Sequence, residues 1–591
     1  MIPLREYPRP QTTRPEDSWR CLNGTWQYAM EKGGLPQGTE ARMPPAQGEI
    51  VVPYSPESEL SGVERQLQPD EVLWYERSLD EADIPSLPAN GRLLLHFGAV
   101  DQSCRVYLNG QLAGSHEGGY FAFTLDITAL MQPRDNRLTV AVTDPSNTGY
   151  RAWGKQSLKP GGIWYRATSG IWQTVWLEAV PQTYIQNIRI TPDCDGSRVQ
   201  LQVQCSGEAP LSGVVSAPAQ AGQTTGGVQM AVFLEESPGV LTASLPDLRA
   251  WSPEDPYLYT FTLRCRQDEV QGYFGMRSFG LCKDAGGIPR LSLNGKPYVP
   301  VGVLDQGYWQ QGMYTPLSDQ AMVDDITQMQ ALGFNIMRKH IKIEPMRWYY
   351  HCDRLGMLVW QDMVSGGGPY KPALIQVLPV LGVQVSDRNA KAFGRGSVAS
   401  RAAYQEELEA TIAQLYSVPS LALWVPFNEG WGQFDAAEAA RRTRVLDPTR
   451  PLDHASGWHD QQAGDLKSRH IYFSKCRIRP DRHGRPAALT EYGGYSYPVP
   501  GHTYSQKAFG YKRYKDLRTY QQAVLGLMDG LLKDGRNIAA FVYTQLSDVE
   551  DETNGLVTFD RQVSKWPPGS QAAEQLRQRN LALRRLAEDT P

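Results

Sequence analysis

The 591-residue sequence is short of several features that would place it quickly in a class of protein. It has no run of about 18 consecutive apolar residues, the length that a membrane-spanning helix requires. Its net charge is only −4, so the composition indicates no basic surface for nucleic acid. The first residues, MIPLREYPRPQTTRPEDSW, carry charges and prolines and no apolar h-region, so they do not read as a signal peptide. We therefore expect a cytoplasmic protein with neither a membrane nor a nucleic-acid partner.

Disulfide and metal patterns are also lacking. The eight cysteines are scattered with no CxxC pair, which indicates reduced thiols and not a disulfide frame or a zinc site. The HExxH spacing of zinc enzymes does not occur. We expect no metal and no other cofactor.

Short strands fill the first half of the chain, which is too long for one core and predicts three or four domains. Residues 1–180 contain alternating segments such as GRLLLHFGAV and NRLTVAVTD, typical of an antiparallel β jelly-roll sandwich, and Asn109–Gly110 predicts a two-residue hairpin turn. Residues 181–283 hold weaker strands such as YIQNIRITP and YLYTFTLRC, which indicate an immunoglobulin-like sandwich, and AGQTTGG between them predicts a loop.

Strands alternate with helices from about residue 284. Eight strand-like segments follow in order, most of them separated by amphipathic segments such as DQAMVDDITQMQALG. The count and the length, residues 284–591, predict a (β/α)8 TIM barrel. A glycine-rich insertion, Val364 to Ser400, interrupts it, and we expect that insertion to shape the leaving-group side of any site.

Two of these strand-like segments end in an acid. LWVPFNEGW places Asn428 and Glu429 after the fourth strand, and AALTEYGG places Glu491 at the seventh. Strand ends feed the loops that line a barrel mouth, so both carboxyls should reach one pocket. Two carboxyls there can cleave a glycosidic bond, one as nucleophile and one as acid and then base, without a cofactor. The Asn428 amide, which both donates and accepts hydrogen bonds, is placed to hold a sugar hydroxyl.

Many ordered motifs resemble glycoside hydrolase family 2, the group of β-galactosidases, β-glucuronidases and β-mannosidases. CLNGTWQY, VPYSPESELSG, WYERSL and TSGIWQTVWLE resemble the family's jelly-roll domain, and WSPEDPYLY and GYFGMRSF resemble the end of its middle sandwich. LNGKPYVPVGV, GFNIMRKH, CDRLGMLVWQD, PFNEGW and TEYGG match barrel positions in the family's order. The resemblance covers nearly the whole chain and implies a retaining, exo-acting β-glycosidase. Family relatives often associate, which favours a homo-oligomer.

The resemblance also implies roles for particular residues. Glu429 would be the general acid/base, Glu491 the nucleophile, and Asn428 the binder of the 2-hydroxyl. Arg338 would hold the charge of the nucleophile, and Tyr472 would donate a hydrogen bond to it. The remaining candidates for lining the substrate pocket are His340, His470, Asp305, Asp362, Tyr492, Trp431 and Tyr543.

Two departures from the family pattern bear on the substrate. The first barrel strand reads GVLDQGYW where the large β-galactosidases have an HE-containing segment, so their metal site is not supported. Glucuronidases hold the sugar acid with an Asn-x-Lys run, whereas the matching run here is Glu552, Thr553 and Asn554. The lysine is missing and Glu552 would repel a uronate, so we expect a neutral carbohydrate substrate, a β-galactoside first. A β-glucuronidase or β-galacturonidase remains an alternative, as does an inactive carbohydrate-binding protein of the same architecture.

Overall fold

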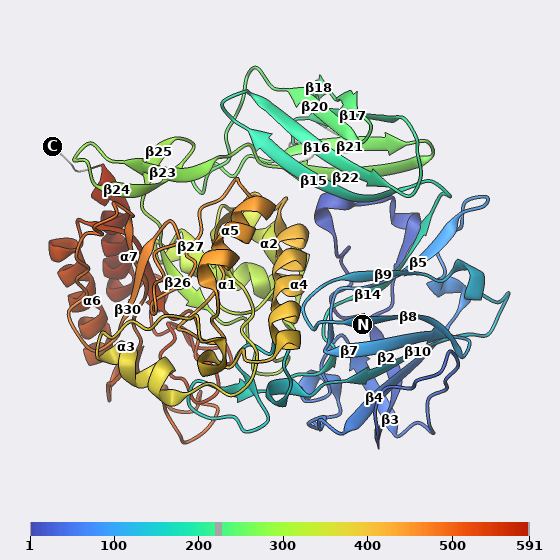
Figure 1. Cartoon of the computed structure of the whole chain (residues 1–591), viewed down its shortest axis with the longest axis horizontal. Helices are drawn as coiled ribbons and strands as arrows, with labels where there is room; N and C mark the ends of the chain where they lie inside the picture. Colours follow the sequence, from blue (N-terminus) through green and yellow to red (C-terminus); the bar gives the residue numbers. More distant parts are fainter. Residues whose placement is uncertain (1, 219–226, 589–591) are drawn as a thin grey trace.

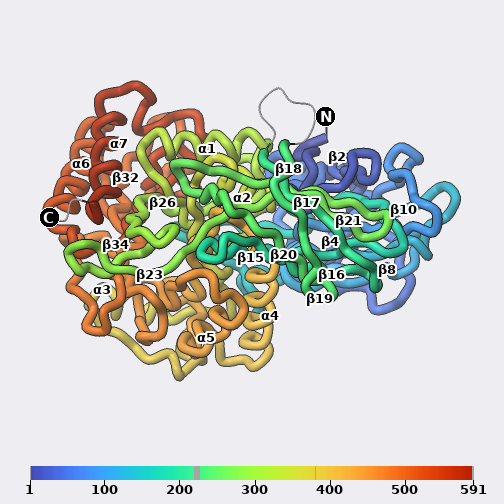
Figure 2. The backbone as a smooth tube through the Cα atoms, turned by 90° about the horizontal axis from the view of Figure 1, so that it is seen from above, coloured from blue at the N-terminus to red at the C-terminus, as the bar shows by residue number. Residues whose placement is uncertain are grey.

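The computed structural model describes residues 2–218 and 227–588 of the chain (Figure 1). A β-sandwich domain, blue, lies beside a barrel, yellow-green to red, and a green sandwich lies across the top of both. Figure 2 shows from above that this green sandwich covers the junction between the other two parts. Among the described residues, no helix is both long enough and apolar enough to cross a membrane. Residues 221–226 of the predicted AGQTTGG loop lie outside the described residues.

The first domain is a jelly-roll sandwich of two antiparallel sheets. One has the order β1-β14-β5-β9 and the other β3-β2-β4-β10-β7-β8. Apolar residues facing inward from both sheets form one core, with Trp26, Tyr75 and Leu95 buried in it. The Asn109–Gly110 turn is confirmed: it joins β7 to β8 with φ of 55° and 82°, the left-handed conformation that a tight hairpin requires. The strands are β1 (Trp19–Cys21), β2 (Gly24–Lys32), β3 (Gly48–Val52), β4 (Glu71–Leu79), β5 (Arg92–Phe97), β7 (Ser103–Leu108), β8 (Gln111–Glu117), β9 (Phe123–Asp126), β10 (Asn136–Thr143) and β14 (Val175–Val180).

The second domain is an immunoglobulin-like sandwich of two four-stranded sheets, β15-β16-β20-β19 and β18-β17-β21-β22. Alternation sets its inner face: in YTFTLRC every second residue is buried, so one side of β21 enters the core. Its strands are β15 (Ile185–Asp193), β16 (Arg198–Cys205), β17 (Leu211–Ser216), β18 (Gln229–Val232), β19 (Leu234–Ser237), β20 (Val240–Ser244), β21 (Tyr259–Cys265) and β22 (Asp268–Phe274). A small sheet, β23 (Phe279–Lys283), β24 (Pro289–Leu293) and β25 (Lys296–Tyr298), leads into the barrel. The limits 1–180, 181–283 and 284–591 stay our proposal for the domains.

The third domain is a TIM barrel. Its strands pair in parallel in the order β29-β28-β27-β26-β34-β31-β30, and all except β30 are buried on both faces because helices cover them. The strands are β26 (Val301–Asp305), β27 (Ile336–Lys339), β28 (Leu358–Asp362), β29 (Leu421–Val425), β30 (Lys467–Ile471), β31 (Ala487–Gly493) and β34 (Ile538–Thr544). The helices are α1 (Asp319–Ala331), α2 (Met346–Leu355), α4 (Val398–Leu415), α5 (Ala436–Leu446), α6 (Leu517–Asp534) and α7 (Gln571–Arg584).

The predicted strand LDHASGW is irregular. Two isolated parallel bridges, Trp424 to Leu452 and Asn428 to Ser456, tie it to the chain of β29. The Leu452 amide donates to the Asp465 carboxylate at 2.8 Å, and such side-chain acceptors compete with a regular strand ladder. Residues 452–456 nevertheless take the fifth position: the two bridges hold them beside the chain of β29, and the Ser468 hydroxyl of β30 donates to the Asp453 carboxylate at 2.9 Å. Glu429 therefore follows the fourth strand and Glu491 lies on the seventh.

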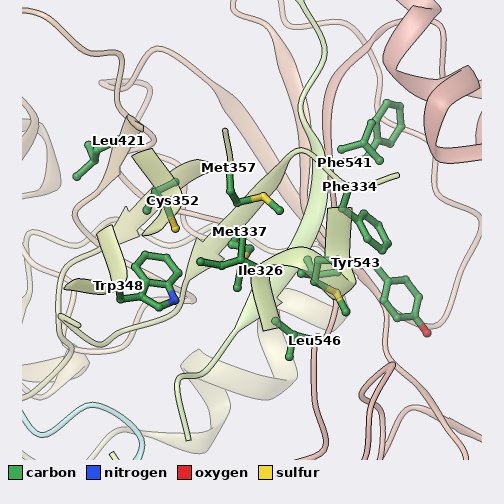
Figure 3. Packing of buried hydrophobic residues seen from close by; sticks show 14 of the residues in the cluster. Ile326, Phe334, Met337, Trp348, Cys352, Met357, Leu421, Phe541, Tyr543 and Leu546 are labelled. Atoms are coloured by element: carbon green, nitrogen blue, oxygen red, sulfur yellow. The ribbon is translucent and has the colours of Figure 1, made fainter. Parts of the chain in front are cut away.

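Apolar side chains of the helices pack against the barrel strands (Figure 3). Ile326 of α1, Met337 of β27, and Trp348 and Cys352 of α2 gather in one buried cluster. Four helices begin with a side-chain cap, as at Ser397, whose hydroxyl accepts from the Ser400 amide before α4. This rigid frame fixes the ends of the strands.

Candidate active site

Glu429 and Glu491 emerge from strands at the same end of the barrel. The residues after β29 turn sharply, and Glu429 itself has φ of 50°, a conformation that a non-glycine residue keeps only when its surroundings hold it. Its amide donates to the Ser456 carbonyl at 3.0 Å, which fixes that turn. Glu491 lies within β31, and both side chains are buried. The strand context thus brings two distant acids together.

His470 of β30 lies between the two carboxyls. Its Nδ1 is 2.7 Å from Oε1 of Glu429, and its Nε2 is 3.5 Å from Oε1 of Glu491. One oxygen of each glutamate and a ring nitrogen of His470 all lie within 4.8 Å of one another. The two acids therefore face a single gap.

Arg338 of β27 holds the Glu491 side of this gap. Its Nη1 donates to Glu491 Oε1 at 3.1 Å, and its Nη2 donates to Asn428 Oδ1 at 2.8 Å. Asp362 of β28 binds the guanidinium through both carboxylate oxygens, at 2.9 and 3.0 Å, and its Oδ2 is 2.9 Å from His340 Nδ1. The bidentate pair orients the arginine, so Arg338 presents a fixed positive charge to Glu491.

Tyr472, at the end of β30, donates its hydroxyl hydrogen bond to Glu491 Oε2. Tyr511 stacks on the Tyr472 ring at 3.7 Å between centroids and an interplanar angle of 10°. Both oxygens of Glu491 therefore have donors, from Arg338 and from Tyr472, which favours the carboxylate form of this side chain.

Two buried polar atoms near the acids have no protein partner among the described residues: Nδ2 of Asn428 and Nε1 of Trp431. Both are donors, and a buried donor without an acceptor is costly. A sugar presents several hydroxyl oxygens that can accept from them. The donor set thus fits a carbohydrate.

Burial dominates the protonation of the acids. It raises the pKa of Glu429 to about 8, against the lowering effect of the positive charges of Lys155 and Arg338. Burial also raises the pKa of Glu491, while His470, Arg338 and Tyr472 oppose that rise. Burial lowers the pKa of His470 to about 4, so this imidazole is neutral at neutral pH. Glu429 is the member of the pair that keeps a proton near neutrality.

The structure brings most, but not all, of the sequence-predicted residues together. Asn428, Glu429, Glu491, Arg338, His340, Asp362, His470 and Tyr472 form one network, and Trp431 lines the adjoining pocket. Asp305 belongs to a neighbouring buried network, in which its carboxylate accepts from Lys339 Nζ at 2.5 Å.

Tyr492 and Tyr543 lie in the core and not at the pocket, which corrects their place among the pocket-lining candidates. The Tyr492 hydroxyl reaches Met528 of α6, at 3.3 Å from its sulfur, and the Tyr543 ring packs edge-on against Tyr492. Successive residues of a strand point to opposite faces, so Tyr492 points to the helix layer while Glu491 points to the barrel centre.

A loop of the first domain completes the site, and sequence reasoning missed it. Residues 150–166 dock on the barrel, where the Trp153 amide donates to the Ser365 carbonyl at 2.9 Å. The Trp164 ring lies 5.2 Å from the Trp431 ring, and Lys155 and Tyr165 approach Glu552. The run WGKQSLKPGGIWY is rich in glycine and aromatics, but nothing in its pattern reveals a contact across almost 400 residues of sequence.

Glu429, on one side of the pair of acids, lines a cavity of about 640 Å³. Its walls come from the first-domain loop, the 364–400 insertion and the barrel, and they are mostly apolar or aromatic: Ile163, Trp164, Ile375, Trp431, Trp458, Tyr472, Phe473 and Tyr511. Glu429 and His470 lie on this wall. A ligand of two or more rings fits this volume.

Glu429, His470 and Glu491 are also the one group of potential metal ligands found in the described part of the chain. Arg338, however, already places a cation 3.1 Å from Glu491. A metal ion there would be repelled by the guanidinium, so the charges of the site favour an organic substrate over an ion.

Two buried carboxyls that lie close together beside a large cavity, at the mouth of a TIM barrel, are typical of enzymes that cleave glycosidic bonds. Comparisons with protein families point to the same class of enzyme. The family model "Glycosyl hydrolase 2 galactose-binding domain-like" matches residues 47–173, "Glycosyl hydrolases family 2" matches 183–277, and its "TIM barrel domain" matches 290–566. The chain belongs to glycoside hydrolase family 2.

Individual relatives are distant. The chain is similar to a β-galactosidase of Halalkalibacterium halodurans, 24% identical over 408 residues, which are 65% of this chain and 36% of that protein. It is also similar to a β-glucuronidase of Paenibacillus borealis, 24% identical over 492 residues, 76% and 74% of the two chains. A β-glucuronidase structure from Ruminococcus gnavus shares the fold over 100% of both chains, with a TM-score of 0.74 and 17% identity. The chain spans about a third of the length of several curated relatives.

Proposed function

We propose that the protein is a retaining, exo-acting β-glycosidase that removes a neutral terminal sugar, a β-galactoside first, from an apolar or aromatic leaving group. The observation that carries the proposal is the approach of Glu429 and Glu491, whose nearest oxygens lie within 4.8 Å. Retaining enzymes hold their two carboxyls about 5–5.5 Å apart, whereas inverting enzymes need about 6.5–9.5 Å to admit a water.

In the first step, Glu491 attacks the anomeric carbon while Glu429 gives its proton to the glycosidic oxygen. The bond from carbon to leaving group breaks, and a glycosyl ester of Glu491 forms. In the second step, Glu429 takes a proton from water, the water oxygen attacks the anomeric carbon, and Glu491 leaves as a carboxylate. The raised pKa of Glu429 and the donors on Glu491 suit this order of roles.

Asn428 and Arg338 position the sugar and the nucleophile. Arg338 binds Asn428 Oδ1, which leaves the amide nitrogen free to donate to a hydroxyl beside the reacting carbon. His340 and Asp362 hold Arg338 in place. These residues act through hydrogen bonds that must keep their geometry as the ester forms.

Two observations favour a uronide instead of a neutral sugar. Lys155 brings a buried positive charge close to the reaction centre, as a sugar acid would need, and the named relatives include β-glucuronidases. A panel of nitrophenyl glycosides (β-galactoside, β-glucuronide, β-galacturonide, β-mannoside and α-L-arabinoside) separates the two. The neutral-sugar proposal fails if a uronide is the best substrate.

The double displacement has its own test. An activated 2-fluoro sugar should label Glu491, and NMR of the first product should show the β-anomer. Glu491→Gln should abolish turnover while the melting temperature stays unchanged. Labelling of another residue, or an α-anomer as first product, would reject the assignment.

Two lesser expectations remain proposals. All eight cysteines are free thiols, which supports a reducing, cytoplasmic location. A homo-oligomer is proposed on the family resemblance alone, and light scattering tests it.

A further inference from the structure

The side chain of Lys155 lies at the junction of the first domain and the barrel. The residue is 6% exposed. Its carbonyl accepts from the Tyr165 amide at 2.9 Å, which closes the 150–166 loop on itself. The loop in turn is bound to the barrel through Trp153, so the position of Lys155 is set by contacts of both domains.

The hydrogen bonds found among the described residues include none from Lys155 Nζ. Its nearest charged partner is Glu552, with Oε2 at 3.6 Å, and aromatic faces surround it, Tyr165 at 5.3 Å and Trp431 at 5.7 Å from the ring centroids. An ammonium group carries three donors. Lys155 Nζ is not among the fully buried unpaired atoms of the described residues, so its donors remain accessible to acceptors of a bound molecule.

Glu552 lies in the loop after β34 and is also buried. Its Oε2 accepts from the Tyr165 hydroxyl, and its Oε1 lies 3.5 Å from Asn554 Nδ2. Lys155 Nζ lies 5.7 Å from the centroid of the Trp431 ring, and Trp431 and Glu429 line the same cavity. In keeping with that position, Lys155 lowers and Glu552 raises the pKa of Glu429, whose shift burial dominates. The pair therefore lies beside the cavity that Glu429 lines.

We propose that Lys155 and Glu552 act together as the sugar-recognition pair that selects neutral sugars over uronic acids, with Lys155 donating to a sugar hydroxyl and Glu552 accepting from one. The inference rests on the proposed glycosidase function and deepens it. The two formal charges cancel, and a hydroxyl both donates and accepts, so it satisfies both partners. The carboxylate of a uronate only accepts, and beside Lys155 it would meet the negative charge of Glu552 in a buried site.

The proposal predicts the effect of neutralising either charge of the pair. Glu552→Gln leaves Lys155 as an uncompensated buried cation. We expect kcat/KM on the β-galactoside to fall, and the ratio of kcat/KM for β-glucuronide or β-galacturonide to that for β-galactoside to rise by at least about tenfold, the effect of one hydrogen bond to a charged group. Lys155→Met should lower kcat/KM on neutral sugars by a similar factor and leave the ratio low.

Glu550→Gln is the matched control. Glu550 lies in the same loop and pairs with Arg166 at 3.1 Å from another part of the 150–166 loop. This variant also loses a carboxylate, yet it should leave the ratio unchanged. An unchanged ratio in Glu552→Gln, or a Lys155→Met enzyme with wild-type kinetics on neutral sugars, overturns the proposal.

Binding measurements test the role of the pair independently of the proposed hydrolase activity. Isothermal titration calorimetry with free galactose and free glucuronate measures sugar affinity and requires no turnover. If the wild type cleaves none of the glycosides, the proposed function fails, yet Glu552→Gln should still shift the relative affinity toward glucuronate. If either variant melts well below the wild type, Lys155→Arg serves as a second test, because it keeps the positive charge. Lys155→Arg should retain galactose affinity better than Lys155→Met. Equal galactose affinities of these two variants would also overturn the proposal.

Discussion

Nδ1 of His470 lies 2.7 Å from Oε1 of Glu429, and the same ring turns its Nε2 toward Arg338. Arg338 can only donate, so Nε2 is assigned as the acceptor and Nδ1 carries the proton. His470 therefore donates to Glu429 and favours its ionised form, the form that must activate water in the second step.

Replacing His470 should show in that second step. In His470→Ala, we expect the alkaline limb of kcat/KM to move upward by up to about one pH unit and turnover of good leaving groups to fall about 10–100-fold, since one charge-assisted hydrogen bond is lost. Pre-steady-state kinetics with a dinitrophenyl glycoside should show a burst from the accumulated ester. His470→Asn should restore part of the rate. A pH profile identical to wild type would contradict this role.

The protonation of Glu429 predicts the pH range of activity. The reaction requires the acid form, and burial raises the pKa of Glu429 to about 8, so kcat/KM should fall as pH rises through that value. Glu429→Ala should remove this limb and slow poor leaving groups far more than good ones, because good leaving groups need no proton. A limb that persists in Glu429→Ala would show that another group titrates.

Trp164 should contribute to binding of the leaving group and not to the chemistry at the sugar. Its ring contacts Trp431 and forms part of the cavity wall. Trp164→Ala should raise KM for aryl glycosides about 3–10-fold, as loss of an aromatic contact does, and leave kcat nearly unchanged. Tyr150→Ala is the control, because its half-exposed ring lies in the same loop and does not line the cavity. A fall in kcat with constant KM would contradict this assignment.

Activity should not depend on a divalent metal. Arg338 supplies the positive charge beside Glu491. Dialysis against EDTA should therefore leave kcat/KM within about twofold, which is less than the effect of one hydrogen bond. A larger loss that Mg²⁺ restores would show that Glu429, His470 and Glu491 hold an ion.

Glu407 of α4 should make stability depend on pH. Burial against the first domain raises the pKa of Glu407 to about 7, and Arg151 lies 3.7 Å away. The folded pKa exceeds the unfolded value, so stability is complete below about pH 4.5 and falls as pH rises through 7, by at most about 3 kcal/mol. Glu407→Gln should raise the melting temperature at pH 8 and not at pH 4.5. Glu406→Gln, on the exposed face of the same helix, is the control; an equal effect of both variants would refute the assignment.

The pattern of a short apolar strand followed by an acid predicted the two central residues of the site. LWVPFNEGW and AALTEYGG are short apolar runs that end in acids, and barrel geometry turns that local pattern into a shared pocket. The same logic, applied one residue further, would have excluded Tyr492, since neighbours on a strand face opposite sides. The fifth strand was harder, because the Asp465 side chain replaces a ladder hydrogen bond there.

Contacts between distant segments could not be predicted. Lys155 and Glu552 lie almost 400 positions apart, and neither has a periodic pattern that points to the other. Their meeting depends on how the first domain docks on the barrel, which is decided by backbone contacts such as that of Trp153 with Ser365. Local sequence sets the strands, and docking sets part of the specificity.

The docked 150–166 loop has a consequence for any attempt to use the barrel alone. A fragment that begins near residue 284 would keep both glutamates but would lose Lys155 and Trp164, leaving one wall of the sugar chamber missing. The two glutamates belong to the barrel alone, whereas substrate recognition is shared between the barrel, through Glu552, and the first domain, through Lys155 and Trp164. A chimera that exchanges only the first domain should therefore change its sugar preference while both catalytic carboxyls are retained.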